Sequence, residues 1–174
     1  MNDIWFSSDH HFSHTNILTF KRDDGTPLRP FSSVEEMDET MIENWNKVVG
    51  ENDRIYHLGD LAMHNRALNS IMPRLNGRKV LIKGNHDANT ANNYLKYFDD
   101  IRAFDRKDNY ILAHVPIHPS SLGRFRQLHG HLHYRHVLLD DGSKDERYFN
   151  VSVECHNYAP ISLEQVKSYY AKSI

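Results

Sequence analysis

Three short apolar segments in the first half of the chain each end in a cluster of polar residues, and a helical pattern follows. The apolar segments are 3–7, 53–58 and 78–83. The clusters are Ser8-Asp9-His10-His11, Gly59-Asp60 and Gly84-Asn85-His86-Asp87. Strands that alternate with helices are typical of βαβ units with parallel strands. We therefore expect a parallel sheet whose polar clusters lie at its carboxyl edge.

Periodic apolar residues predict three helices, over 34–48, 68–75 and 163–171. Capping boxes precede the first and the last, formed by Ser33 with Glu36 and by Ser162 with Gln165. The second is expected to end near Gly77, because glycine commonly follows a helix. The periodic apolar residues give each helix one apolar face, which we expect to pack against the sheet.

The second half is expected to contain mainly strands. Segments 101–104 and 110–113 flank a polar turn, and 125–129 and 148–153 are further candidates. Segments 22–30 and 140–146, rich in Asp with Gly, Pro or Lys, are interpreted as surface loops. A chain of 174 residues with 39% hydrophobic residues suits one domain with one core. We expect a single mixed α/β domain over 1–174.

Composition excludes several kinds of site. The net charge of -2 provides no overall positive field for nucleic acid. The apolar runs are too short to cross a membrane, and residues 1–12 lack signal-peptide features, so we expect a cytoplasmic protein. One cysteine excludes an internal disulfide and a Cys-rich zinc site. With 13 histidines, any bound metal is expected to have nitrogen and oxygen ligands.

Five clusters of metal-competent side chains fall at the expected strand ends. They are Asp9-His10-His11, Gly59-Asp60, Gly84-Asn85-His86-Asp87, Ala113-His114-Val115-Pro116 and Gly130-His131-Leu132-His133. Singly, each has a structural explanation as a cap, a turn, a core histidine or a solvent-facing pair. Loops at the carboxyl ends of strands converge, however, and His131 and His133 point to the same side of an extended segment. Together the clusters favour a metal site.

The order of these motifs over residues 9–133 resembles the calcineurin-like metallophosphoesterase superfamily. Segment 8–17 also resembles a compact branch of it found in bacteria and phages. The resemblance implies a four-layer αββα sandwich, with two mixed sheets packed together and helices on both outer faces. Asp-His-His also marks a different phosphoesterase family, but there it follows other metal-binding motifs, and we disfavour that assignment.

The resemblance also implies two metal ions and their ligands. Asp9, His11 and His133 would hold the first ion, Asp60 would bridge both, and Asn85, His114 and His131 would hold the second. A shared carboxylate keeps two cations roughly 3.5–4 Å apart, which suits two oxygens of one phosphoryl group. Divalent or trivalent Mn, Fe, Zn, Ni or Co all suit imidazole and carboxylate ligands.

The expected function is hydrolysis of a phosphomonoester or phosphodiester by attack of a metal-bridging hydroxide. A small nucleotide-like substrate is favoured. His86 is expected to be the general acid or transition-state stabiliser, with Asp87 orienting its ring. His14, Asn16 and His118 are candidate substrate-binding residues, and a solvent-facing loop or a simple turn is the alternative for each. Basic residues in the adjoining loops could select substrate, although ordinary surface positions are favoured for most: Lys21, Arg22, Arg29, Arg124, Arg126 and Arg135.

Other functions remain open at this point. The same site could serve a nuclease or a protein phosphatase, but near-zero charge and short loops argue against a long nucleic-acid groove. A metal-bound binding module without turnover is the alternative from a different class. Segment 23–29 looks like an insertion that acts as a lid or has no role. The sequence specifies no oligomeric state.

Overall fold

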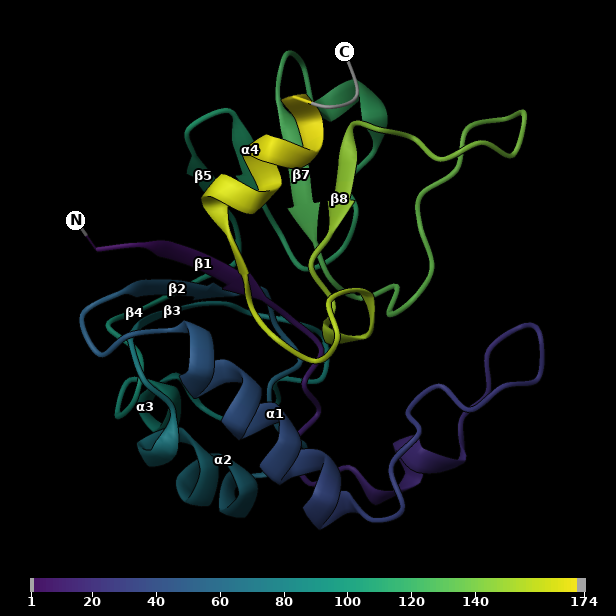
Figure 1. The fold of residues 1–174 in the computed structure, drawn as a ribbon. Helices are drawn as coiled ribbons and strands as arrows, with labels where there is room; N and C mark the ends of the chain where they lie inside the picture. Colours follow the sequence, from purple (N-terminus) through teal and green to yellow (C-terminus); the bar gives the residue numbers. More distant parts are fainter. Residues whose placement is uncertain (1, 172–174) are drawn as a thin grey trace.

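Two β-sheets pack against each other in the computed structural model, which describes residues 2–171 (Figure 1). The first sheet has the strand order β4-β3-β2-β1-β9, and the second has the order β5-β6-β7-β8. The first contains β1 (Ile4–Ser7), β2 (Arg54–His57), β3 (Arg78–Ile82), β4 (Asp100–Arg102) and β9 (Ile161–Ser162). The second contains β5 (Asp105–Lys107), β6 (Tyr110–Leu112), β7 (Arg126–His129) and β8 (Tyr148–Asn150).

Strands β1 to β4 are parallel, as the alternating pattern predicts. Only β9 runs antiparallel in this sheet, beside β1. In the second sheet β6, β7 and β8 are parallel and β5 is antiparallel to β6. Both sheets are therefore mixed, and the chain is an α/β protein.

The candidate strands at 101–104 and 110–113 do not pair with each other in the structure. The strand at 100–102 joins the first sheet, and the partner of β6 is the following segment, Asp105–Lys107. All three residues of β5 are charged and none is buried. An edge strand without apolar residues gives no alternating pattern, so the sequence did not indicate it.

The first and last helices follow their capping signals closely, whereas the predicted helix over 68–75 begins at Asn65 and is α-helical only to Ile71, and the helix Ala91–Tyr94 was not predicted. The helices are α1 (Val34–Val48), α2 (Asn65–Ile71), α3 (Ala91–Tyr94) and α4 (Leu163–Ala171), with short 3-10 turns η1 (Thr15–Thr19), η2 (Met72–Arg74), η3 (Pro119–Ser121) and η4 (Val153–Cys155). Ser33 Oγ accepts from Glu36 N at 3.1 Å, but the Glu36 carboxylate accepts from Ser32 instead of Ser33. At the start of α4 the two bonds of the capping box both form.

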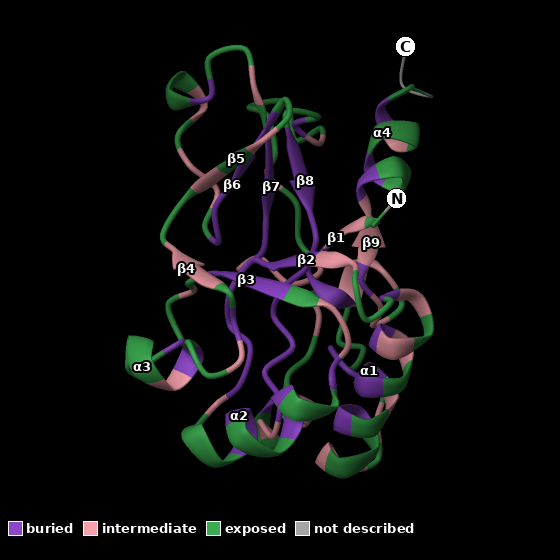
Figure 2. Ribbon diagram, turned by 90° about the vertical axis from the view of Figure 1, so that its left-hand side faces the viewer, coloured by how far each residue is buried: buried purple, intermediate pink, exposed green. Residues whose placement is uncertain are grey.

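Apolar side chains form three clusters. The largest packs α1 and α2 against one face of the first sheet, through residues such as Met41, Trp45 and Leu81. The second fills the space between the sheets and includes Val166 and Tyr170 of α4. Figure 2 shows β7 and β8 buried along most of their length, β4 at an intermediate level, and the outward faces of α1 and α2 exposed.

A small third cluster covers the outer face of the second sheet, where Ile111 and Tyr148 contact Leu122. Leu122 follows directly after η3. The covering segment therefore consists of η3 and loops, and the predicted helical layer on this face does not form within residues 2–171. Proline at positions 116 and 119 explains why this segment does not continue as an α-helix. Across the same described range, no helix combines the length and apolar character that a membrane span needs.

The two sheets meet where β1 and β8 end. Ser8 and Ser152 form an isolated parallel bridge between the two chain segments. Beyond β1 and β2 the backbones stay hydrogen bonded, from Asp9 N to Gly59 O at 3.0 Å and from Phe12 N to Leu61 O at 2.9 Å. The loops that follow the strands are therefore held in register.

Candidate metal centre

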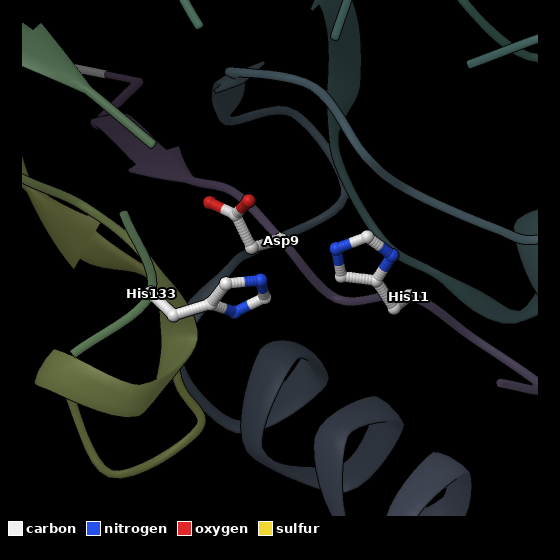
Figure 3. Close-up of side chains that lie close together, drawn as sticks. All are labelled: Asp9, His11 and His133. Carbon is white, nitrogen blue, oxygen red and sulfur yellow. The ribbon is translucent and has the colours of Figure 1, made fainter. Parts of the chain in front are cut away.

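Two groups of potential metal ligands lie at this junction. The first comprises Asp9, His11 and His133, and the second comprises Asp60, His114 and His131. Within each group the ligand atoms lie within 4.8 Å of one another. Figure 3 shows the first group, with Asp9 and His11 on the segment after β1 and His133 on the segment after β7. These are six of the seven residues expected to hold two metal ions.

Asp60 lies between the two groups. Its Oδ2 atom is 3.6 Å from His11 Nε2 and 3.3 Å from His114 Nε2. The other oxygen, Oδ1, accepts a hydrogen bond from His86 N at 2.8 Å. One carboxylate oxygen therefore faces a histidine of each group, which is the position that a bridging ligand needs.

Asn85 belongs to the second group. Its Oδ1 atom is 2.9 Å from both His114 Nε2 and His131 Nδ1. The other nitrogen of His114, Nδ1, lies 2.6 Å from the carbonyl of Leu58, so its proton points there. Burial lowers the pKa of His114, but its interaction with Asp60 outweighs burial and raises it. A cation that displaces the Nε2 proton would have His114 Nε2, Asn85 Oδ1 and Asp60 Oδ2 as neighbouring ligand atoms.

Five of the predicted ligands have left-handed backbone conformations. The φ angles are 58° at Asp9, 49° at His11, 57° at Asp60, 67° at His131 and 51° at His133. Each such conformation costs about 1–2 kcal/mol for a residue with a side chain. Strained residues that carry functional side chains cluster at active sites, where the surrounding structure holds them. Five of the nine non-glycine residues with positive φ in the described part of the chain are predicted ligands, so the strain is concentrated at the candidate site.

Glycines let the ligand loops approach closely. A Cβ at Gly130 would lie 2.4 Å from Asp9 Oδ2, and a Cβ at Gly84 would lie 2.3 Å from Asp60 Oδ1. Both distances are far below van der Waals contact. The glycines that precede His131 and Asn85 are therefore required by the packing of the ligands themselves.

We expect Gly84→Ala to weaken metal binding by at least about tenfold, because the new methyl group must displace Asp60. Gly142→Ala is the control. Gly142 has a positive φ of 82°, so alanine costs stability there, but no atom lies within 4 Å of the new Cβ. Isothermal titration calorimetry with Mn²⁺ measures the metal affinity of both variants. Equal affinities for the two variants would contradict the packing argument.

The histidine His11 has the properties of a metal ligand. It is 4% exposed, and neither of its ring nitrogens has a hydrogen-bond partner. Burial, followed by the charge of Arg29, lowers its pKa well below the usual value. A neutral imidazole with an unpaired buried nitrogen is costly unless it binds a cation.

The carboxylate of Asp9 is fully buried and anchored on several sides. It accepts hydrogen bonds from Ser152 Oγ at 2.8 Å and from His131 N at 3.0 Å. Burial nevertheless raises its pKa, because desolvation disfavours the charged form. A bound cation would reverse this effect, so the donor set fits a metal ion.

A buried ion pair behind the site was missed by the sequence analysis. Glu154 Oε1 accepts from His133 Nδ1 at 2.9 Å, which leaves His133 Nε2 for a metal. The same oxygen accepts from Arg29 Nε at 2.9 Å, and both side chains of the ion pair are 0% exposed. Segment 22–30 was interpreted as a surface loop, but its Arg29 is internal.

Arg29 also holds the backbone of the first ligand segment. It donates to the carbonyl of His10 at 2.6 Å and to the carbonyl of Asp9. The interpretation of Arg29 as a surface or substrate-selecting residue is therefore wrong, since its partners among residues 2–171 are internal and its side chain is buried. The sequence did not indicate this role, because Arg29 lies in a segment whose Asp, Gly and Pro content is typical of a surface loop.

The charge on Glu154 makes stability depend on pH. Burial raises the pKa of Glu154, but Arg29 and His133 outweigh burial and lower it from 4.5 to about 2. A carboxyl with a depressed pKa stabilises the fold above its unfolded pKa, and this contribution is lost as the pH falls from about 5 toward 2.

In metal-free protein, we expect the free energy of unfolding of the wild type to fall more steeply between about pH 5 and pH 3 than that of Glu154→Gln. Gln at this position cannot lose a charge on acidification. Urea titrations at fixed pH values measure the two slopes. Parallel slopes would show that Glu154 does not carry this pH dependence.

His86 and Asp87 have different surroundings. His86 is exposed, and its ring centroid lies 5.4 Å from that of His11, at the open side of the site. Asp87 is 1% exposed and accepts from the backbone of Asp60 at 2.9 Å and of Gly84 at 2.8 Å. Its carboxylate therefore holds the ligand loops together. The predicted role of Asp87 in orienting the His86 ring is wrong.

The three candidate substrate-binding residues also differ. The His14 ring lies 5.7 Å from the His11 ring, so it borders the site. Asn16 is exposed on η1, and its backbone carbonyl accepts from Thr19 Oγ1 at 2.8 Å. The exposed His118 accepts from Ser120 N at 3.3 Å as the cap of η3. For His118, the simple turn is the better interpretation.

A cavity of about 560 Å³ opens beside the ligands His131 and His133. Phe20, Lys21 and Tyr134 line it as well. The turn that contains Asp23 contacts two residues that line this cavity. Asp23 N donates to Tyr134 Oη at 3.0 Å, and the Asp23 carboxylate pairs with Arg135. Segment 23–29 therefore docks beside the candidate centre.

The fold and the site define this molecule as a two-sheet α/β protein with a candidate centre for two metal ions. No model of a known protein family matches the chain. The chain is 37% identical to the uncharacterized protein MJ1445 of Methanocaldococcus jannaschii over 174 residues, covering 95% of this chain and 90% of that protein. It therefore belongs to the same family as MJ1445.

Two further comparisons cover the chain to different extents. The gene 66 protein of Mycobacterium phage L5 is 37% identical over 94 residues, which are 50% of this chain and 41% of the phage protein. The crystal structure of AQ665, a protein of unknown function from Aquifex aeolicus, matches with a TM-score of 0.72 at 26% identity. That match covers 97% of this chain and all of AQ665. The same fold is thus present in a solved structure.

Proposed function

We propose that the protein is a two-metal phosphoesterase of the calcineurin-like metallophosphoesterase superfamily. The observation that carries the proposal is the position of Asp60, whose Oδ2 atom faces His11 Nε2 of one ligand group and His114 Nε2 of the other. A shared carboxylate between two nitrogen-rich groups suits a pair of transition-metal ions. The αββα arrangement of the superfamily is part of the proposal, with η3 and loops in place of one outer helical layer.

The residues have separate roles in this proposal. Asp9, His11 and His133 would hold one ion, Asn85, His114 and His131 would hold the other, and Asp60 would hold both. Two bound cations would lower the pKa of a shared water and neutralise charge on the phosphoryl oxygens. Glu154 and the Leu58 carbonyl fix the tautomers of His133 and His114, so that each presents Nε2 to the site.

The exposed histidine His86 would act on the substrate. Its backbone is fixed by the bond to Asp60 Oδ1, while its ring lies at the open side of the site. From there it could donate a proton to the leaving oxygen or stabilise charge on the phosphoryl group. A small phosphate ester, with nucleotide-like esters favoured, suits the cavity of about 560 Å³ beside the ligands.

The test uses purified protein loaded with Mn²⁺ and assayed on bis-p-nitrophenyl phosphate and p-nitrophenyl phosphate. We expect hydrolysis that EDTA abolishes and that added Mn²⁺ restores. The ratio of the two rates gives the preference for diesters or monoesters. If neither ester nor a panel of nucleotides is hydrolysed while metal binds, the protein is a metal-bound binding module and the proposal is wrong.

We expect His86→Ala to lower kcat roughly 100-fold or more while both metal ions stay bound, because general acid catalysis contributes that much. Metal content is measured by elemental analysis of the dialysed protein. His64→Ala is the control, since His64 is an exposed histidine that caps α2. Loss of metal from His86→Ala would show instead that His86 is a ligand.

A further inference from the structure

A large cavity among the described residues lies outside the candidate metal centre. It has a volume of about 810 Å³ and lies between the 134–156 region and α4. It is lined by none of the seven predicted ligands. A concave site of this size suits a small organic ligand. The two-metal proposal gives it no role.

The lining of this cavity combines positive charge with aromatic rings. Arg22 and Lys144 supply the charge. Arg22 lies over the Tyr134 ring at 5.1 Å, and it also interacts with the Asp24 carboxylate and the Tyr158 hydroxyl. Lys144 Nζ lies 4.7 Å from the centroid of the Tyr169 ring, donates to Tyr169 Oη at 2.6 Å and lies 4.0 Å from Glu146 Oε1. Phe149 and Ile161 add apolar surface. Cations beside flat apolar surfaces are suited to a ligand with a phosphate and an aromatic ring.

The cavity is connected to the metal centre at His133. Three of its lining residues contact His133: Asn150 Nδ2 donates to the His133 carbonyl at 2.6 Å, Cys155 Sγ lies 3.3 Å from the same oxygen, and Glu154 accepts from its ring. Tyr134, the next residue in the chain, also lines the cavity. A ligand that moves these residues must change the position of His133.

We propose that this cavity is a second binding site, for a nucleoside monophosphate, and that its occupancy is transmitted to the metal centre through His133. The phosphate would lie near Arg22 and Lys144, and the base against the aromatic side chains. Because this site uses no metal ligand, its existence does not depend on the proposed hydrolysis.

Binding is tested with the full-length protein in EDTA, by calorimetry with AMP, GMP, CMP and UMP. We expect at least one of them to bind, and to bind at least about tenfold more tightly than its nucleoside or inorganic phosphate alone. Arg22→Gln and Lys144→Gln should each weaken binding by about tenfold or more. Lys96→Gln and Arg66→Gln make the same charge changes at exposed positions away from the cavity and should leave binding unchanged.

Two further measurements decide the outcome. Asp60→Asn should bind the nucleotide as the wild type does, whereas a site at the metal centre would be disturbed. In metal-free protein, the imidazole NMR signals of His133, assigned with His133→Asn, should shift on nucleotide addition in the wild type but not in Arg22→Gln. The proposal is overturned if none of the four nucleotides binds, if Arg22→Gln and Lys144→Gln bind normally, or if the His133 signals stay fixed.

Discussion

Asp60→Asn is expected to lower kcat/KM on bis-p-nitrophenyl phosphate by at least about a thousandfold, equivalent to about 4 kcal/mol of transition-state stabilisation. The reason is that one atom, Oδ2, faces both ligand groups, at 3.6 Å from His11 Nε2 and 3.3 Å from His114 Nε2. Asparagine keeps the size and the acceptor for His86 N but removes the charge. We therefore expect both ions to bind weakly in an otherwise intact fold.

Metal content separates this prediction from a general loss of structure. Elemental analysis should show two ions per wild-type chain and fewer than one in Asp60→Asn, with unchanged circular dichroism. Asp140→Asn removes a carboxylate from an exposed loop position and should behave as the wild type. If Asp60→Asn keeps two ions and full activity, Asp60 does not bridge. If both proteins bind metal without activity, the phosphoesterase proposal fails but the metal centre remains.

The parallel half of the fold could be predicted because local signals and tertiary structure agree there. Each of β1, β2 and β3 is an apolar run that ends at a polar cluster, and parallel pairing places these clusters at one edge. Capping residues indicated where α1 and α4 begin. The charged strand β5 gave no such signal, because at a sheet edge its pairing depends only on its backbone.

The candidate metal ligands could be predicted from the order of motifs, but the buried residues that hold these ligands in place could not. Glu154 is 125 residues from Arg29 in sequence, and nothing local indicates that either is buried. Asp87 shows a different error. Because it is next to His86 in sequence, it was predicted to orient the His86 ring, but its carboxylate accepts from the backbone of Asp60 and Gly84 instead. Sequence spacing gives the side of the chain a residue lies on, but not which buried group it contacts.

The second large effect is expected from Arg29→Met, which should lower the free energy of unfolding by about 3–5 kcal/mol. The substitution keeps apolar volume but leaves Glu154 as a buried charge without its partner, and it frees the carbonyls of Asp9 and His10. Urea denaturation in EDTA measures the effect without a contribution from bound metal. Arg74→Met breaks the exposed pair with Glu39 and should cost less than about 1 kcal/mol.

The double variant Arg29→Met/Glu154→Gln distinguishes an unpaired charge from a simple loss of packing. Removing both charges should restore part of the stability, because a buried pair replaced as a unit costs less than one partner removed alone. Metal affinity should nevertheless stay about 10–100-fold below the wild type, since Gln binds the His133 Nδ1 proton without the carboxylate charge. A double variant as unstable as Arg29→Met would show that Arg29 acts through the Asp9 and His10 carbonyls rather than through Glu154.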